Sequence, residues 1–239
     1  MKKKVLYGIL VVSTLAVLAV LLLVFKKDIN EDGLKFKKEY ESLNGEVNNY
    51  NSKKYMELTI PRDNPIKYVK AGDIVKLMEE ESTFVVYFGF KECPSCRSVV
   101  EPLMEAAKES EIDVIYYVDV KDIRNVYELD ENNNPKETKK GSEDYYKLLT
   151  YFNDVLYNYS LYTKDGKEVK TEMKRIYSPN IISVLDGVPT TLTIAEPKGY
   201  KDHYKNMTDK QFKECKNDIL KVLEEVVTYT NTCGIEKPC

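Results

Sequence analysis

The stretch that decides the fold is "TFVVYFGFKECPSCRSVVEPL", residues 83–103. It opens with a continuous run of apolar, β-branched and aromatic residues, which is typical of a strand buried on both faces. Two cysteines, Cys93 and Cys96, follow at once, and apolar residues then recur at helical spacing, with Pro102 expected to kink that helix. Residues 113–120, "DVIYYVDV", form a second apolar run. Together these segments predict a right-handed strand–helix–strand unit.

Two ordinary explanations of the cysteine pair are weak. A zinc site needs about four ligands, but the chain has a single histidine, His203, and no second pair of cysteines at this spacing. We therefore expect neither a metal nor another cofactor. A structural disulfide between Cys93 and Cys96 would close so short a loop that the unfolded chain would lose little entropy.

A redox role fits the local chemistry better. Pro94 suits the first turn of a helix, where its missing N–H costs nothing. The free backbone N–H groups at this helix start favour a thiolate on Cys93, and Ser95 can add a hydroxyl donor. Cys96 lies one turn further on, where it can resolve a mixed disulfide. We expect Cys93 to be solvent-accessible and Cys96 to be largely shielded. Between a buried strand and a helix, this spacing is a strong signal for a redox site.

These segments resemble the thioredoxin-like superfamily. "FVVYFGFKECPSC" is similar to its strand-to-active-site segment, and "GVPTT", residues 187–191, is similar to its loop whose cis-proline faces the active site. The resemblance implies an α/β protein with a thioredoxin-like three-layer α/β/α fold, in which Cys93 attacks and Cys96 resolves. It also implies a cis bond before Pro189, with substrate-binding residues Val188, Pro189 and Thr190. More closely, the chain resembles membrane-anchored, exported thioredoxin-like proteins of Gram-positive bacteria, some labelled bacteriocin transport accessory protein.

The chain departs from the thioredoxin pattern around the cysteines. Glu92 replaces the aromatic residue that usually precedes the first cysteine, and Tyr87 falls where thioredoxin has a buried acid. Without that carboxylate, no buried like charge raises the thiol pKa values. Glu92 opposes a thiolate on Cys93, and we expect Lys91 to offset this in part. A stabilised thiolate favours the reduced form, so we expect the pair to be more oxidising than thioredoxin's, which lies near −270 mV.

The N-terminus predicts a membrane anchor. After Lys2, Lys3 and Lys4 comes an uncharged, apolar run over residues 5–25, which as a helix is roughly 31 Å long, enough to cross a hydrocarbon core. A long cleavable signal peptide is the alternative. We expect a single-pass protein of the cell membrane, attached through residues 5–25, with its soluble domain outside the cytoplasm.

Composition shifts divide the rest of the chain. After the anchor (1–25), residues 26–65 are polar and predict a juxtamembrane spacer with a short helix over 31–43. The thioredoxin-like domain is expected over 66–230. It carries an insertion at about 121–180, between the third strand and the cis-proline loop, with a polar loop (128–141), a helix (142–160) and a hairpin at residues 165–166. A last helix is expected over 208–228, before a cysteine-containing tail (231–239).

Three further cysteines leave the pairing open. A disulfide between Cys215 and Cys233 is disfavoured, because about 20 Å of helix would separate Cys215 from the end of the last helix. A structural disulfide between Cys233 and Cys239 is easy through a turn at Gly234, and one between Cys215 and Cys239 requires the tail to fold back. The alternative to a structural disulfide is that two of these cysteines form a second redox pair, which relays electrons to Cys93.

The sequence thus predicts an extracytoplasmic thiol–disulfide oxidoreductase that uses the Cys93–Cys96 pair on exported protein thiols or disulfides. A membrane electron donor or acceptor would be a further partner. The alternatives are a non-enzymatic accessory or binding module for an exported peptide or protein, and a copper or haem maturation factor. The net charge of −3 provides no basic excess for nucleic acid.

Overall fold

The computed structural model describes residues 30–236. The anchor expected at residues 5–25 therefore lies outside the described residues. In the part that is described, we find no helix with the length and apolar character needed to cross a membrane.

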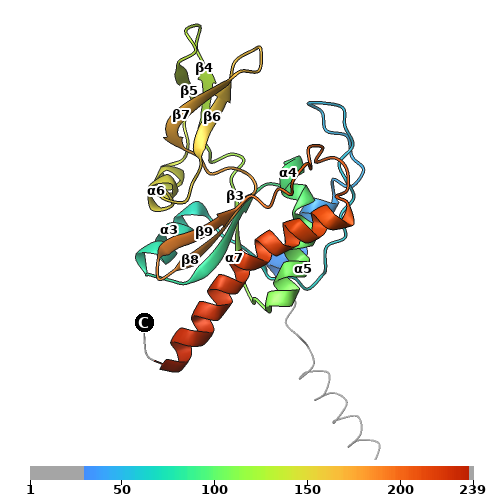
Figure 1. Cartoon of the computed structure of the whole chain (residues 1–239), viewed down its shortest axis with the longest axis vertical. Coiled ribbons are helices and arrows are strands. Elements are labelled where there is room, and N and C mark those ends of the chain that lie inside the picture. The colour runs from blue at the N-terminus through green and yellow to red at the C-terminus, as the bar shows by residue number, and fades with distance from the viewer. Residues whose placement is uncertain (1–29, 237–239) are drawn as a thin grey trace, which may run out of the picture. The chain divides into compact units, whose positions relative to one another are not determined.

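A five-stranded mixed sheet forms the centre of the domain (Figure 1). The strands lie in the order β1-β3-β2-β8-β9, and β1, β3 and β2 are parallel while β8 runs antiparallel to β2 and β9 antiparallel to β8. Their bounds are β1 Ile66–Tyr68, β2 Phe84–Gly89, β3 Ile115–Asp119, β8 Asn180–Leu185 and β9 Val188–Thr193. The predicted strand–helix–strand unit is confirmed, since β2 and β3 are parallel neighbours joined by helices.

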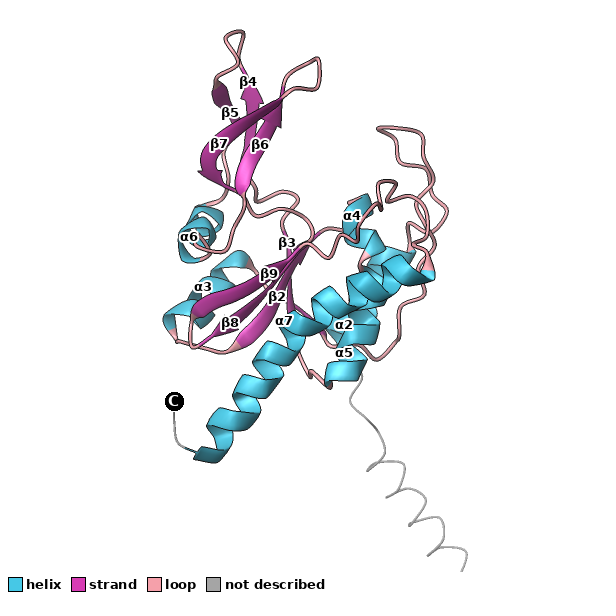
Figure 2. Ribbon diagram, viewed as in Figure 1, coloured by secondary structure: helices cyan, strands magenta, loops and turns pink. Residues whose placement is uncertain are grey.

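Helices cover both faces of this sheet (Figure 2). One face packs against α3, Ala71–Glu79, and α6, Glu143–Tyr151. The other packs against α2, Glu31–Glu41, α5, Val100–Ser110, and α7, Asp209–Glu236. The result is a mixed α/β fold with helices on both sides of a mixed sheet, an arrangement compatible with a thioredoxin-like fold.

The unbroken apolar run of β2 follows from its central place. Val85 and Tyr87 belong to the core on the α2, α5 and α7 side, whereas Val86 and Phe88 belong to the core on the α3 and α6 side. All four side chains are fully buried. Because successive side chains of a strand point to opposite faces, a strand covered on both sides must be apolar at every position.

Residues 32–65 belong to the compact unit, so the prediction of a spacer over 26–65 is wrong in the part of it that the structure describes. The helix expected there is present as α2, and its Phe36 and Tyr40 are fully buried against the sheet. These two residues are four apart and share one helix face. The compact unit accordingly begins at Asp32. Phe36 and Tyr40 form the apolar face that packs on the sheet, although most residues of the segment are polar.

The insertion forms two β-hairpins beside α6. The first comprises β4, Val126–Leu129, and β5, Pro135–Lys139; the second comprises β6, Asn158–Tyr162, and β7, Glu168–Lys174. We call these four strands the hairpin arm (Figure 1). The predicted hairpin at residues 165–166 is confirmed, with Gly166 at φ 83°. The helix predicted over 142–160 ends early at Tyr151, and the predicted polar loop is largely the β4–β5 hairpin.

The last helix is longer than predicted. It continues to Glu236 and includes Cys233 in its backbone. Cys215 and Cys233 are therefore 18 residues apart along one helix, or roughly 27 Å, which excludes a disulfide between them. Cys215 is a buried free thiol whose pKa is raised to about 12 by burial. Cys239 lies outside the described residues, so its predicted pairing with Cys233 stays a prediction.

Candidate active site

The two cysteines of the predicted redox pair lie at the start of a broken helix. Its first part is α4, Pro94–Ser98, and α5 begins at Val100. The break at Val99 is explained by Pro102, which offers no N–H to the carbonyl of Ser98 four residues earlier and whose ring crowds that carbonyl. The expected kink therefore lies one turn before the proline.

Cys93 caps α4 with its sulfur. The backbone N–H of Cys96 donates to Cys93 Sγ over 3.2 Å, and Cys93 Sγ donates to the backbone carbonyl of Ser178 over 3.4 Å. The hydrogen bond from the Cys96 side chain, together with that backbone N–H and the charge of Arg124, lowers the pKa of Cys93 despite its burial. A depressed pKa is the property that a nucleophilic cysteine needs.

Cys96 has the opposite character. Its side chain is fully buried, whereas Cys93 keeps 8% exposure. Burial raises the pKa of Cys96 well above its ordinary value, and the neighbouring Cys93 raises it further. Cys96 is thus shielded as predicted, but the prediction that Cys93 is solvent-accessible is wrong, because Cys93 is also buried and is only slightly more exposed than Cys96. The pair combines a thiolate-favouring sulfur with a protonated one directly behind it.

The cis-proline predicted at Pro189 is found elsewhere. The Ser178–Pro179 bond is cis, and it is the only cis peptide bond in the described residues. This loop precedes β8, whose Asn180 pairs with Phe88 at the end of β2 that leads to Cys93. The carbonyl that contacts Cys93 is therefore that of Ser178, not that of Val188.

The residues predicted to bind substrate lie in β9. Val188 pairs with Leu185, and Pro189 with Val184, whose neighbour in β2 is Phe84. Because Phe84 starts β2 and Cys93 follows its end, Val188 and Pro189 are roughly a strand length, about 17–20 Å, from the pair. Thr190 contributes a hydroxyl contact to Ser183 over 3.0 Å. The structure does not bring these residues to the cysteines.

Arg124 is a site residue that the sequence did not indicate. It follows β3, and its Nη1 donates to Ser178 Oγ over 2.8 Å. Its guanidinium lies 5.1 Å from the centre of the Phe90 ring. Arg124 thus steadies the loop that contacts Cys93 and places a positive charge near that sulfur. No sequence signal marks this role, because Arg124 and Ser178 are 54 residues apart.

Tyr87 of β2 contacts the backbone of the second cysteine. Its hydroxyl donates to the backbone carbonyl of Cys96 over 3.2 Å. This contact needs the glycine at position 89, since a Cβ there would lie 2.9 Å from the Tyr87 hydroxyl. Burial raises the pKa of Tyr87 well above its ordinary value, so the position that the resemblance marks for a buried acid holds a neutral donor.

Glu92 is neutralised by a residue other than its expected partner. Its carboxylate pairs with Lys121 over 2.9 Å, whereas Lys91 had been expected to offset it. The Tyr55 hydroxyl also donates to the Glu92 carbonyl over 3.1 Å. The carboxylate next to Cys93 is thereby turned toward a lysine, which weakens its opposition to a thiolate.

Arg97, directly after the second cysteine, ties the N-terminal segment to the active-site helix. It is fully buried and donates to the Tyr40 carbonyl over 2.6 Å, to Asn44 Oδ1 over 2.9 Å and to the Met56 carbonyl over 2.8 Å. One of these acceptors lies in the last turn of α2, where carbonyls lack helical partners. We call this set of three hydrogen bonds the Arg97 clamp.

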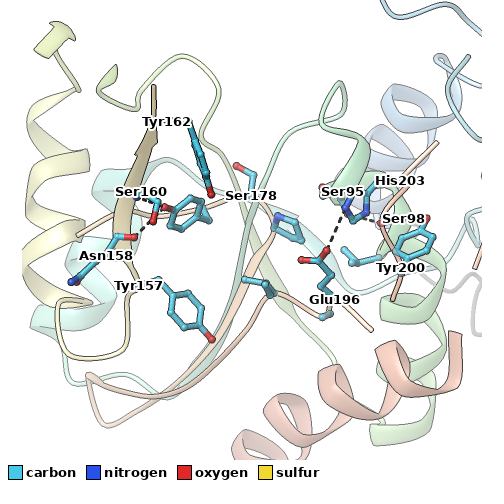
Figure 3. A pocket seen from close by; sticks show the side chains of 15 residues that line it. Ser95, Ser98, Tyr157, Asn158, Ser160, Tyr162, Ser178, Glu196, Tyr200 and His203 are labelled. Atoms are coloured by element: carbon cyan, nitrogen blue, oxygen red, sulfur yellow. Dashed lines mark hydrogen bonds and ion pairs between the residues drawn. The ribbon is translucent and has the colours of Figure 1, made fainter. Parts of the chain in front are cut away.

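A cleft of about 420 Å³ opens beside the pair. Ser95 and Ser98 of α4 line it together with Ser178 and Pro179 of the cis-proline loop. Figure 3 shows Tyr157, Tyr162 and Ser160 on one side of this cleft and Glu196, His203 and Tyr200 on the other. The hairpin arm and the residue before it thus form one wall of the cleft, so the insertion contributes directly to the candidate site.

The fold and site define a mixed α/β protein with a buried dithiol between a strand and a helix, next to an open cleft. In the described residues no group of three His, Cys, Asp or Glu side chains could hold a metal ion. No protein-family model matches the chain, and a comparison with curated proteins finds no match either.

Proposed function

We propose that this protein is a thioredoxin-like thiol–disulfide oxidoreductase that is anchored in the cell membrane and acts on exported proteins. The observation that carries the proposal is the contrast between the two thiols. Cys93 has a lowered pKa and some exposure, while Cys96 has a raised pKa and none. A structural pair has no need of such a contrast, whereas exchange needs one attacking and one resolving sulfur.

The proposed reaction in the oxidising direction is as follows. A substrate thiolate attacks Cys93 in the Cys93–Cys96 disulfide, the S–S bond breaks, and Cys96 leaves and takes up a proton. A second substrate thiolate then attacks the substrate sulfur of the mixed disulfide and releases Cys93 as a thiolate. Two electrons pass from the substrate to the pair, and an external disulfide oxidant must reoxidise it. A low pKa makes Cys93 a good leaving group in the second step.

A trapping experiment tests this function. A Cys96→Ala variant in intact cells should accumulate mixed disulfides with exported proteins, because the Cys93 thiolate still attacks substrate disulfides but no Cys96 thiol is present to attack Cys93 and release the substrate. They would be seen as reductant-sensitive bands and identified by mass spectrometry. The matched control is Cys93→Ala/Cys96→Ala, which keeps the other three cysteines. Bands that persist in the control, or no bands in the single variant, would contradict exchange at Cys93.

The proposed location has its own test. Residues 5–25 are uncharged and apolar, and the proposal places the following domain outside the cytoplasm. Protease added to intact spheroplasts should then digest the domain described here. Protection that ends only after lysis would reverse the topology and favour a role in the reducing cytosol.

A binding function without exchange is the second candidate. The observation in its favour is the near-complete burial of Cys93 beside an open cleft. On this hypothesis the cleft holds an exported polypeptide and the thiols are dispensable. If a Cys93→Ser/Cys96→Ser variant restores the wild-type phenotype to a deletion strain, binding is favoured over redox chemistry.

A further inference from the structure

The cleft beside the cysteine pair has one aromatic wall. Tyr157 is 51% exposed and Tyr162 64% exposed, and both come from the base or first strand of the second hairpin. Tyr177 extends this wall, and its ring is held because its hydroxyl accepts from the Ser160 N–H over 3.0 Å and donates to the Asn158 carbonyl over 3.1 Å. The aromatic wall is therefore built on a fixed backbone and presents uncovered ring surface.

The opposite wall carries a carboxylate. Glu196 lies across the cleft from the tyrosines (Figure 3), and its side chain is 46% exposed. Among the described residues it makes one ion-pair contact, with His203 at 3.7 Å between Oε1 and Nε2, and this histidine is charged only when protonated. The distance is beyond that of a hydrogen bond. No lysine or arginine is among the described residues that line the cleft. The carboxylate is thus free to accept from a ligand.

Rings facing a carboxylate recognise a cation. An ammonium or guanidinium is attracted to the face of a tyrosine ring, and a carboxylate adds a charge-assisted hydrogen bond. A guanidinium satisfies both at once, since it is planar, stacks on rings and donates in a fork. A neutral aliphatic side chain would gain from the rings but would offer no hydrogen-bond donor to Glu196.

We propose that this cleft is a specificity site for an arginine or lysine side chain of the polypeptide that reacts with Cys93. The inference rests on the proposed oxidoreductase function and assigns its substrate class: exported segments with a cationic residue near the reactive cysteine. Ser178 joins the two sites, because its carbonyl contacts Cys93 and the residue also lines the cleft. Tyr162 of the hairpin arm and Tyr157, which directly precedes β6, then select the substrate.

Matched peptides test the inference. The probes are extended peptides with one cysteine and one arginine moved through each flanking position, each paired with a peptide carrying citrulline, the uncharged analogue of arginine. The protein is the full chain with Cys96→Ala, Cys233→Ser and Cys239→Ser, with Cys93 activated by 5-thio-2-nitrobenzoate. The peptide thiolate attacks Cys93 and releases the coloured thiolate, so the rate is read directly.

At the best position we expect the arginine peptide to react at least fivefold faster than its citrulline partner. E196Q should bring this ratio within twofold of one, and Tyr162→Leu should reduce it while keeping an apolar wall. Glu131→Gln removes an exposed carboxylate from the arm outside the cleft and should leave the ratio unchanged. Circular dichroism verifies that each variant is folded.

Two outcomes would overturn the inference. The first is a wild-type ratio below twofold at every position, and the second is a ratio that survives E196Q. A binding measurement with serine in place of the peptide cysteine separates this failure from failure of the proposed function. Arginine peptides should still bind more tightly than citrulline peptides even if no exchange occurs, and equal binding would reject the cleft whatever the redox result.

Discussion

Replacing Arg97 with methionine is expected to lower the free energy of unfolding by about 3–5 kcal/mol. The side chain is fully buried, and its loss removes three hydrogen bonds. The Met56 carbonyl loses its donor, whereas the Tyr40 carbonyl and Asn44 Oδ1 keep the backbone N–H groups of Leu43 and Leu58. Hydrogen bonds to a charged group contribute about 1.5–3 kcal/mol each, and an unpaired buried carbonyl costs about 1–3 kcal/mol. Since a domain is stable by only about 5–15 kcal/mol, chemical denaturation should measure the loss easily.

Two further variants separate the Arg97 clamp from a general effect of charge. Lys108→Met removes an exposed cation from α5 and should change stability by no more than about 0.5 kcal/mol. Arg97→Lys keeps the charge but has no fork with which to reach three acceptors, so it should fall between wild type and Arg97→Met. A loss below about 1 kcal/mol in Arg97→Met would show that water or rearrangement replaces the clamp. Hydrogen exchange should also rise first in α2.

Alkylation of the reduced protein near pH 7 is expected to modify Cys93 at least about 100-fold faster than Cys96. The thiolate is the reacting species, and the pKa of Cys93 is lowered while burial raises that of Cys96. As pH rises, the midpoint of the rise in the Cys93 rate should lie below the ordinary cysteine pKa of about 8.5, because the pKa of Cys93 is lowered. Peptide mapping by mass spectrometry distinguishes the sites, and equal rates would refute the assigned roles.

Arg124 provides the corresponding electrostatic test. Arg124→Gln removes a positive charge that lowers the pKa of Cys93. One unit charge at such a partly buried site is worth about 1 kcal/mol or more, so the Cys93 alkylation rate at pH 6 should fall roughly fivefold. Arg124→Lys should restore most of the rate. The pair should also become less oxidising in glutathione buffers, because a less stable thiolate destabilises the reduced form. An unchanged rate would restrict Arg124 to holding Ser178.

Short sequence patterns were enough to predict the central strand, the cysteine pair that follows it and one hairpin turn. The buried run at 84–89 and the cysteines after it could be interpreted because a central strand must be apolar at every position. The turn at residues 165–166 was predicted from its Asp-Gly pair, because glycine readily adopts the positive φ that a tight hairpin turn requires. The packing of α2 was missed because its burial depends on Phe36 and Tyr40 meeting a distant sheet, which composition does not reveal.

The site was only partly predictable. The cysteines form a contiguous motif, but the groups that tune them come from far along the chain. "GVPTT" matched a short pattern, yet the cis bond lies before Pro179, where the chain enters β8. Nothing in the local sequence distinguishes Arg97 and Arg124 from surface cations. Tertiary contacts alone make Arg97 fully buried and Arg124 partly buried. The cleft depends on the hairpin arm approaching α4, for which no spacing rule exists.

Pro189 has a different consequence in its actual position. It lies in β9, which pairs only with β8 among the described strands and so forms an edge of the sheet. An exposed edge offers amide and carbonyl groups to strands of other molecules, and Val188 beside it is a 60% exposed apolar side chain. Proline is tolerated in a sheet where its nitrogen faces away from the partner strand. Because proline has no N–H, Pro189 reduces the number of amide donors along the open edge of β9. It therefore disfavours pairing of this edge with a strand of another copy of the folded protein.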